Sequence, residues 1–320
     1  MKVLVPAKIN TLLYLLHKRE DGYHELYSHF VPISLYDSLE IIPQNQSGIT
    51  LEVDGMDFEE GLQNNLVYRA AELFQEHWSN PFGMSIILKK NIPVGAGLGG
   101  GSADAAATLH VLNQLHQNPF SRKELQDLAL NLGADVPFFI DPEPSEVRGI
   151  GDVIRPLKHY PLLPLLILKP FFSISTAEAF QESIPRRMKV PMKIVNDEEL
   201  VRNLENRFEY TLFKKYPELK ELKNQCLEHG ALGASVSGSG SALFALFRTE
   251  SEQMEAARKL KRISPTEIFP CKMLKNIFTM VFKETEFFPE KWSVYIVFGD
   301  AGLQRLQQKN TIIEESVRDS

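Results

Sequence analysis

A single glycine-rich segment constrains this chain more than any other part of its sequence. Five of the seven residues from 95 to 101 are glycine, and an alanine-rich stretch follows at residues 105–107. Glycine allows positive φ and close approach to a ligand, and the first turn of a helix offers unpaired N–H groups. The segment therefore predicts a phosphate-binding loop before a helix, made of Pro93, Val94, Gly95, Ala96, Gly97, Leu98, Gly99, Gly100, Gly101 and Ser102.

The residues around this loop exclude the commonest phosphate-binding motifs. Gly95, Gly97 and Gly100 satisfy the G-x-G-x-x-G spacing, but a dinucleotide site also needs an acidic residue at a strand end about 20 residues further on. Glu124 lies instead in a polar, helix-like run. Ser102 stands where a Walker A loop has Lys and a protein-kinase loop has Val. A third kind of phosphate loop remains, with a glycine-rich helix cap that binds nothing as the alternative.

The composition is that of an ordinary globular enzyme. The chain has 320 residues, of which 43% are apolar and 24% charged, enough for a sizeable core and two domains. Its net charge of -6 disfavours nucleic acid or an anionic membrane as the main partner. Cys226 and Cys271 lie outside any metal-ligand spacing, and no apolar run is long enough for a membrane span. We expect a cytoplasmic protein without a disulfide framework.

The first strand is expected over residues 2–16 and carries two polar side chains on one face. Lys8 and Asn10 share that face, and simple alternation places Val3, Val5, Ala7 and Ile9 on the other. A lysine inside so apolar a strand is either an edge-strand lysine or a functional cation. The strand alone does not decide between these two interpretations.

Two short segments place polar or aromatic residues at turns. Residues 21–25 form a turn that carries Tyr23 and His24. Asp135 is expected at the start of an apolar strand over residues 136–139, where a turn or cap role is the alternative. Helices are expected near residues 65–77 and 121–132, with a strand at 84–88 before the glycine loop.

The second half of the chain is expected to begin after an exposed connection at residues 141–146, which is rich in proline and acidic residues. Strands are expected at 165–170 and 242–247, and a helix at 217–229. The small residues at 233–241 either line a second anion site or form a flexible hairpin connection.

These segments, in this order, resemble the GHMP kinase superfamily. Its members share a lysine-bearing first strand, a P-x-G-x-G-L-G-type loop and a late glycine/serine motif. The matching segments are Pro6-Ala7-Lys8-Ile9-Asn10, Asp21-Gly22-Tyr23-His24-Glu25-Leu26, the glycine loop through Ala107, Leu132 to Phe139, Ser175 to Phe180, and Ser237 to Ser241. The turn at 21–26 and the segment at 132–139 point to the branch whose alcohol substrate carries a cytidine diphosphate.

The resemblance implies an ATP-dependent phosphotransferase with an alcohol as acceptor. It implies transfer of the γ-phosphate of ATP to the 2-hydroxyl of a cytidine-diphosphate-linked methylerythritol, in the non-mevalonate synthesis of isoprenoid precursors. By the same resemblance, Asp135 takes the hydroxyl proton and Lys8 stabilises the developing charge. Mg²⁺ is expected because phosphoryl transfer needs charge bridging between phosphates, with Ser102 as its protein contact.

The resemblance also assigns residues to the two substrates. The glycine loop holds the phosphates of ATP, and Asn65 contacts the adenine. Tyr23 and Phe180 sandwich the pyrimidine, whose edge is read by His24. Further contacts to the cytidine-linked substrate are expected from Asn10, Thr176, Ser239 and Gly240.

The fold implied by the resemblance is α+β with two domains. A ribosomal-protein-S5-like α/β sandwich is expected over residues 1–147 and a ferredoxin-like α+β domain over 148–285, with the substrates between them. Residues 286–320 are an extension without a recognised counterpart. Two alternatives stay open: a kinase for another alcohol, such as mevalonate or homoserine, and a noncatalytic nucleotide-binding regulator.

Overall fold

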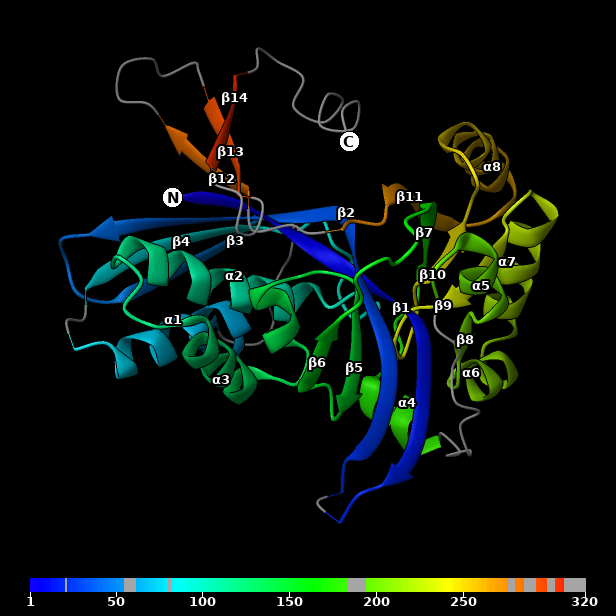
Figure 1. Cartoon of the computed structure of the whole chain (residues 1–320), viewed down its shortest axis with the longest axis horizontal. Helices are drawn as coiled ribbons and strands as arrows, with labels where there is room; N and C mark the ends of the chain where they lie inside the picture. Colours follow the sequence, from blue (N-terminus) through cyan, green and yellow to red (C-terminus); the bar gives the residue numbers. More distant parts are fainter. Residues whose placement is uncertain are drawn as a thin grey trace.

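The computed structural model describes residues 1–20, 22–54, 62–79, 82–182, 194–275, 280–284, 292–297 and 303–307. Within these residues the chain forms two β-sheets with helices on their outer faces (Figure 1). Asp21 of the predicted turn lies outside the described residues, as does most of the extension predicted at 286–320.

The larger sheet has the strand order β14-β13-β12-β1-β2-β4-β3. Strands β5 and β6 continue from β2, and β8 pairs with β1. The strands of this sheet are β1 (Lys2–Lys18), β2 (His24–Gln44), β3 (Ile49–Asp54), β4 (Gly83–Lys89), β5 (Ser145–Gly149), β6 (Val153–Pro156), β8 (Glu205–Asn206), β12 (Met280–Glu284), β13 (Trp292–Val297) and β14 (Leu303–Gln307).

The smaller sheet has the order β11-β7-β10-β9. Its strands are β7 (Pro164–Pro170), β9 (Gly233–Val236), β10 (Leu243–Leu246) and β11 (Thr266–Lys272). The helices described are η1 (Leu62–Asn64), α1 (Leu66–His77), α2 (Gly100–Leu115), α3 (Arg122–Leu132), η2 (Val136–Ile140), α4 (Thr176–Glu182), α5 (Asp197–Arg202), α6 (Glu209–Lys215), α7 (Pro217–Glu228) and α8 (Glu250–Ile263).

Three buried clusters hold these layers together. Helices α1, α2 and α3 bury their apolar faces against the larger sheet, and α7 and α8 cover the outer face of the smaller one (Figure 1). A third cluster lies between the sheets, where Ile9 and Val31 of the larger sheet join Ile167 and Phe244 of the smaller one. Because burial of apolar side chains is the main favourable term in folding, this shared core fixes one sheet against the other.

Irregular pairing in β1 decides which way Lys8 points. The pairing of β1 with β2 shifts between Pro6 and Ala7. Val3 and Val5 pack in the core of α1–α3, whereas Ala7 and Ile9 pack between the sheets. The simple alternation predicted for this strand is therefore wrong after Pro6, where the regular pairing with β2 is interrupted.

Two other local predictions are wrong. Asp135 precedes the 3-10 helix η2 and not a strand, and Pro137 lies in the first turn of that helix, where proline is tolerated. The predicted exposed connection at 141–146 is partly strand β5, which pairs with β2 from Leu26 to Phe30. The predicted domain boundary at 147/148 falls inside β5, and the division into domains stays a prediction.

A buried histidine on β2 gives the fold a titratable core. His29 is 3% exposed, its ring lies 5.6 Å from that of Tyr160, and its Nε2 is 3.3 Å from the Tyr27 hydroxyl. Its Nδ1 has no hydrogen-bond partner among the described residues. Burial lowers the pKa of His29 to about 4, although Glu146 opposes this shift.

We predict that His29 makes the fold less stable in mild acid. As the pH falls from about 6.5 towards 4, the unfolded chain binds a proton that the folded chain does not, so stability is lost over this window. Between pH 7.5 and 4.5 the parent should lose about 2 kcal/mol more unfolding free energy than His29→Phe. Urea denaturation at both pH values measures this difference.

Replacement of the exposed His159 by Gln serves as the control and should leave the pH dependence unchanged. An equal pH dependence in the parent and in His29→Phe would show that the buried imidazole does not contribute.

Candidate active site

A cleft of about 710 Å³ lies beside the helix-facing side of β1. It brings together most of the predicted site residues, which come from seven separate parts of the chain. Those that line it are Lys8, Asn10, Tyr23, Asn65, Pro93, Val94, Gly95, Ala96, Gly97, Leu98, Gly99, Gly100, Gly101, Ser102, Asp135, Thr176, Phe180 and Ser239. Two predicted substrate contacts, His24 and Gly240, are not among its lining residues.

Lys8 and Asp135 form an ion pair in this cleft. The Lys8 Nζ lies 3.5 Å from the Asp135 Oδ2, and the two side chains are 4% and 34% exposed. The ammonium also donates to the Asn10 Oδ1 at 2.7 Å and to the Gly97 carbonyl at 3.2 Å. Three acceptors match the three N–H groups of a protonated lysine, so the site is built for the charged form.

Burial acts against this charge. It lowers the pKa of Lys8 below the ordinary lysine value, and the neighbouring Asp135 carboxylate opposes the shift. Asp135 is thus the counter-ion of Lys8. Because its carboxylate is partly exposed, a substrate in the cleft can also reach it. An ammonium and a carboxylate side by side can stabilise and deprotonate a hydroxyl placed between them.

A chain of hydrogen bonds orients Asn10 towards Lys8. The Asn10 Nδ2 donates to the Ser28 hydroxyl at 3.0 Å, and that hydroxyl donates to the Leu12 carbonyl at 2.5 Å. Since its amide nitrogen is held by Ser28, the Asn10 oxygen is turned to Lys8. Asn10 therefore positions the ammonium, in addition to the substrate contact predicted for it.

The glycine loop has the backbone that its sequence predicts. Gly95, Gly97 and Gly99 have φ of 62°, 75° and 73°, a region that side chains disfavour. Helix α2 begins at Gly100, and no side chain caps its first turn. Its first N–H groups are therefore available to an anion, with the positive end of the helix dipole behind them.

The late glycine/serine segment packs directly on this loop. The Ser237 hydroxyl donates to the Gly97 carbonyl at 2.9 Å, and the Ala242 N–H donates to the Ala96 carbonyl at 3.1 Å. Ser239 and Thr176 meet through their hydroxyls at 3.0 Å. Residues 233–236 are strand β9, and the segment after them is the hairpin connection from β9 to β10, which is buried against the glycine loop. A second anion site there stays a prediction.

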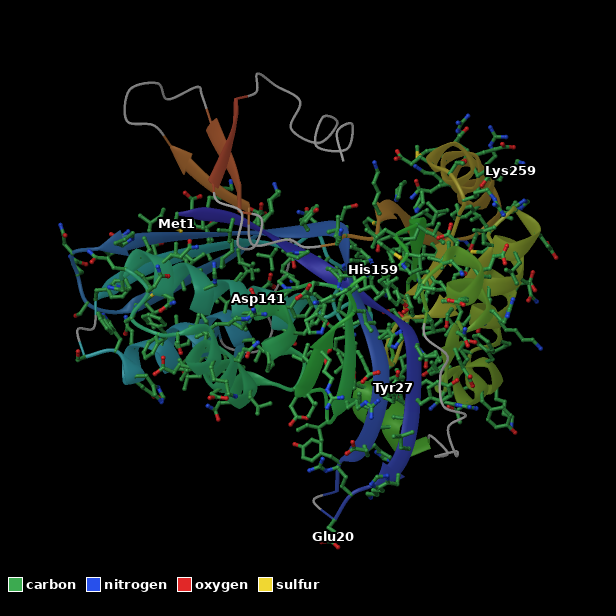
Figure 2. The ribbon with its side chains drawn as sticks, in the orientation of Figure 1. Met1, Glu20, Tyr27, Asp141, His159 and Lys259 are labelled. Carbon is green, nitrogen blue, oxygen red and sulfur yellow. The ribbon has the colours of Figure 1, made fainter. Side chains whose placement is uncertain are left out.

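The other end of the cleft is formed by the β1–β2 hairpin and α4. Figure 2 shows Glu20 at the hairpin tip, close in sequence to Tyr23 and His24. The rings of His24 and Phe180 lie 5.7 Å apart, and Tyr23 is 61% exposed. Partial burial, and to a smaller extent Lys18, lowers the pKa of His24, which favours the neutral imidazole. A neutral imidazole can both donate and accept a hydrogen bond.

Asn65 has a structural task besides the adenine contact predicted for it. It is the N-cap of α1, and its Oδ1 accepts from the Val67 N–H at 2.9 Å. It also lines the cleft beside the glycine loop. Asn is a common N-cap residue, so the sequence predicts a helix start at Asn65. The place of Asn65 in the cleft depends on how α1 packs on α2.

A buried triad beside the cleft is not among the residues predicted from the sequence. Lys90 contacts Asp37 and Asp104, and both Lys90 and Asp104 line the cleft. One signal was available in the sequence, because Asp104 is a charged residue inside an alanine-rich run. Asp37 belongs to β2, and only the fold brings it to the other two residues.

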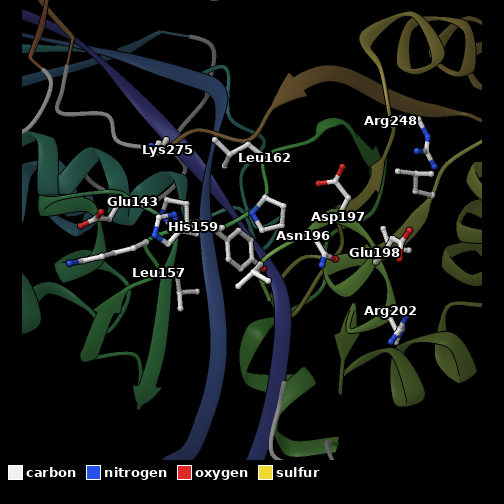
Figure 3. A pocket seen from close by; sticks show the side chains of 17 residues that line it. Glu143, Leu157, His159, Leu162, Asn196, Asp197, Glu198, Arg202, Arg248 and Lys275 are labelled. Carbon is white, nitrogen blue, oxygen red and sulfur yellow. The ribbon is translucent and has the colours of Figure 1, made fainter. Parts of the chain in front are cut away.

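A larger groove, of about 1480 Å³, lies elsewhere on the molecule (Figure 3). Its lining includes His159, Arg202 and Arg248 together with the acidic Asp197 and Glu198. It contains no part of the glycine loop and neither Lys8 nor Asp135. The predicted catalytic residues therefore line the smaller cleft and not this groove.

Comparison with known proteins identifies the family. The GHMP kinases N terminal domain matches residues 65–141, and the GHMP kinases C terminal domain matches residues 177–265. A 4-diphosphocytidyl-2-C-methyl-D-erythritol kinase of Syntrophus aciditrophicus is 37% identical over 281 residues, which cover 84% of this chain and 98% of the relative. A second, of Pelotomaculum thermopropionicum, is 41% identical over 266 residues, or 80% of this chain and 91% of the relative.

Solved structures agree with this relationship. A crystal structure of 4-(cytidine 5'-diphospho)-2C-methyl-D-erythritol kinase has a TM-score of 0.74 at 37% identity and covers 85% of this chain and 99% of its own. Homoserine kinase from Cytophaga hutchinsonii has a TM-score of 0.69 at 20% identity, with 86% and 95% covered, which shows a shared fold. The chain therefore belongs to the GHMP kinases and, within them, to the 4-diphosphocytidyl-2-C-methyl-D-erythritol kinase family.

Membership confirms the α+β GHMP kinase fold predicted from the sequence and the class of enzyme, an ATP-dependent phosphotransferase. Among the helices that the structure describes, none has the length and apolar character needed to cross a membrane. The roles of individual site residues stay predictions.

We predict that Gly97 cannot be replaced by alanine without loss of stability. A Cβ there would lie 2.1 Å from the Ser237 carbonyl oxygen, and φ is positive. Both effects strain the folded state, so Gly97→Ala should lower the unfolding free energy by about 2 kcal/mol or more. Urea denaturation measures this loss.

Gly101→Ala is the matched control, because a Cβ there would meet its nearest atom at 3.6 Å and alanine favours a helix. Its unfolding free energy should equal or exceed that of the parent. Equal stability of the two variants would mean that the close contact of the two loops is not required.

Proposed function

We propose that this enzyme transfers the γ-phosphate of ATP to the 2-hydroxyl of 4-diphosphocytidyl-2-C-methyl-D-erythritol, a step of non-mevalonate isoprenoid precursor synthesis. The observation that carries the proposal is the Lys8–Asp135 pair, 3.5 Å apart, beside the uncapped N-terminus of α2. The names of relatives that cover most of the chain supply the acceptor.

The ATP phosphates occupy the glycine loop in this proposal. The positive φ of its glycines turns the backbone so that successive N–H groups face one side, and the first turn of α2 adds further donors. Asn65, at the start of α1, contacts the adenine with the atoms that its capping role leaves available.

Asp135 removes the proton of the acceptor hydroxyl as that oxygen attacks the γ-phosphorus. A positioned base of this kind accelerates a reaction by roughly 10²- to 10⁴-fold. The Lys8 ammonium pairs with the carboxylate, and it stabilises the negative charge that develops on the attacking oxygen and the transferred phosphoryl group. Asn10 and the Gly97 carbonyl hold the ammonium in place.

The cytidine moiety lies at the hairpin end of the cleft. Tyr23 and Phe180 stack on the pyrimidine, and the neutral His24 reads its edge. Thr176, Ser239 and Gly240, from α4 and the late loop, contact the rest of the substrate. A simple alcohol such as mevalonate would leave the aromatic residues unused, which disfavours the alternative acceptors.

The residues present fit a magnesium ion bound mainly by the phosphates. The Ser102 hydroxyl lines the cleft in the first turn of α2 and would be its protein contact. An ion held mainly by water and phosphate oxygens needs no cluster of protein ligands, and none of three acidic, histidine or cysteine side chains occurs among the described residues. When bound, Mg²⁺ would neutralise charge between the β- and γ-phosphates.

A cytoplasmic location, and the absence of nucleic-acid and membrane partners, remain predictions from composition and charge. In this proposal, every residue placed in the cleft has a role toward one of the two small-molecule substrates.

The identity of the acceptor can be tested with the purified protein by measuring how much ADP it releases from Mg-ATP. 4-Diphosphocytidyl-2-C-methyl-D-erythritol, mevalonate and homoserine are offered separately, with and without excess CDP. We expect turnover with the cytidine compound alone and inhibition by CDP, because CDP occupies the pyrimidine end of the cleft. Turnover with another alcohol would overturn the acceptor, and ATP binding without turnover would favour a regulator.

Asp135→Asn should lower kcat by roughly 10²- to 10⁴-fold and leave ADP affinity within about twofold of the parent. The amide keeps the size of the side chain but cannot take the proton. Steady-state kinetics and calorimetric ADP titration measure the two effects.

Asp127→Asn, which alters an exposed carboxylate paired with Lys123, is the control and should have parental kcat. Parental turnover in Asp135→Asn would remove Asp135 as the base.

A further inference from the structure

Lys90 is buried between two carboxylates directly before the glycine loop. It follows β4, and its Nζ contacts the Oδ2 of Asp37 and, at 2.6 Å, the Oδ2 of Asp104. The three side chains are 7%, 0% and 2% exposed. The transfer of charged side chains from water into the protein interior costs free energy. Such a group therefore persists only where its members are paired.

Asp37 also holds the backbone that leads into the loop. Its Oδ1 accepts from the N–H of Asn91 at 2.6 Å and from that of Ile92 at 2.8 Å. The Asn91 side chain donates to the Tyr36 carbonyl at 3.1 Å. The chain is thus fixed to β2 immediately before Pro93, where the phosphate-binding segment begins.

Asp104 connects the other end of the loop to the same lysine. It lies in the second turn of α2, and a Cβ added to Gly100, the first residue of that helix, would lie 3.3 Å from the Lys90 Nζ. The lysine head therefore lies directly against the first residue of α2. The triad joins β2, the end of β4 and α2 around the loop that they enclose.

We propose that Asp37, Lys90 and Asp104 form a positioning device for the nucleotide, which holds both ends of the glycine loop so that its N–H groups face the phosphates of ATP. None of the three needs to touch the reacting atoms, so they are positioning residues. The inference rests on the ATP-binding part of the proposed function and is independent of the acceptor.

The charge balance of the triad fits this role. Two ionised carboxylates around one ammonium would leave a buried negative charge beside the site of an anionic ligand. Burial raises the pKa of Asp104 to about 8, with Lys90 opposing and Asp37 adding to this shift. The direction of this shift favours a triad of small net charge. The Asp104 Oδ1 has no hydrogen-bond partner in the described part of the chain.

The test measures calorimetric binding of Mg-ADP, which needs no acceptor, to the full-length protein. Lys90→Met should weaken ADP binding at least tenfold, because the two ends of the loop are no longer joined. The double variant Lys90→Met/Asp104→Leu replaces two of the three triad members by apolar side chains, and Asp37 keeps its bonds from the N–H groups of Asn91 and Ile92. It should show the same loss in ADP affinity while remaining folded.

A control variant and steady-state kinetics distinguish the positioning role of the triad from a merely structural role. Gln253→Leu removes another buried polar side chain, which bonds the Leu165 and Cys271 carbonyls on the smaller sheet. It should lower the melting temperature without changing ADP affinity. In the triad variants the KM for ATP should rise at least tenfold, with the KM for the acceptor within twofold of the parent.

ADP affinity equal to the parent in the folded double variant would overturn the positioning role. Failure of the cytidine compound as acceptor would leave the ADP measurement valid, so the two hypotheses fail separately.

Discussion

The ammonium of Lys8 is the contact on which the arrangement of this active site depends. It is buried, and its three neighbours come from different parts of the chain: Asn10 on β1, the Gly97 carbonyl in the glycine loop, and Asp135 before η2. Each neighbour compensates part of the cost of burying the charge, so all three are drawn to one point. The phosphate loop and the carboxylate therefore have a fixed distance from each other.

The second half of the chain completes the site through backbone contacts. Ser237 and Ala242 bond to carbonyls of the glycine loop, and the Asn206 side chain donates to the Val236 and Gly238 carbonyls at 2.7 and 2.8 Å. The two small-residue loops can approach this closely because Gly97 has no side chain. A Cβ at this position would overlap the Ser237 carbonyl. The cleft therefore lies where the two halves of the chain meet. The core that both halves share lies between the two sheets.

The parts of the site that the sequence predicts are those with local causes. The glycine loop and the start of α2 follow from residue types that favour positive φ and a helix, and Asn65 is the type of residue that begins a helix. The faces of β1 were mispredicted after Pro6, because a bulge depends on the pairing with β2. Strand β5 was taken for a connection because its pairing with β2 is a non-local interaction.

By itself, the sequence determined the family and predicted the phosphate loop, with Lys8 and Asp135 as candidate catalytic residues, because these depend on residue type and local backbone freedom. Tertiary structure alone decided that Lys8 faces the helices, that Asp37 reaches Lys90 and Asp104, and that the predicted site residues meet in one cleft. The physical reason is that these outcomes depend on strand register and on the joint burial of distant segments. No local pattern encodes either of them.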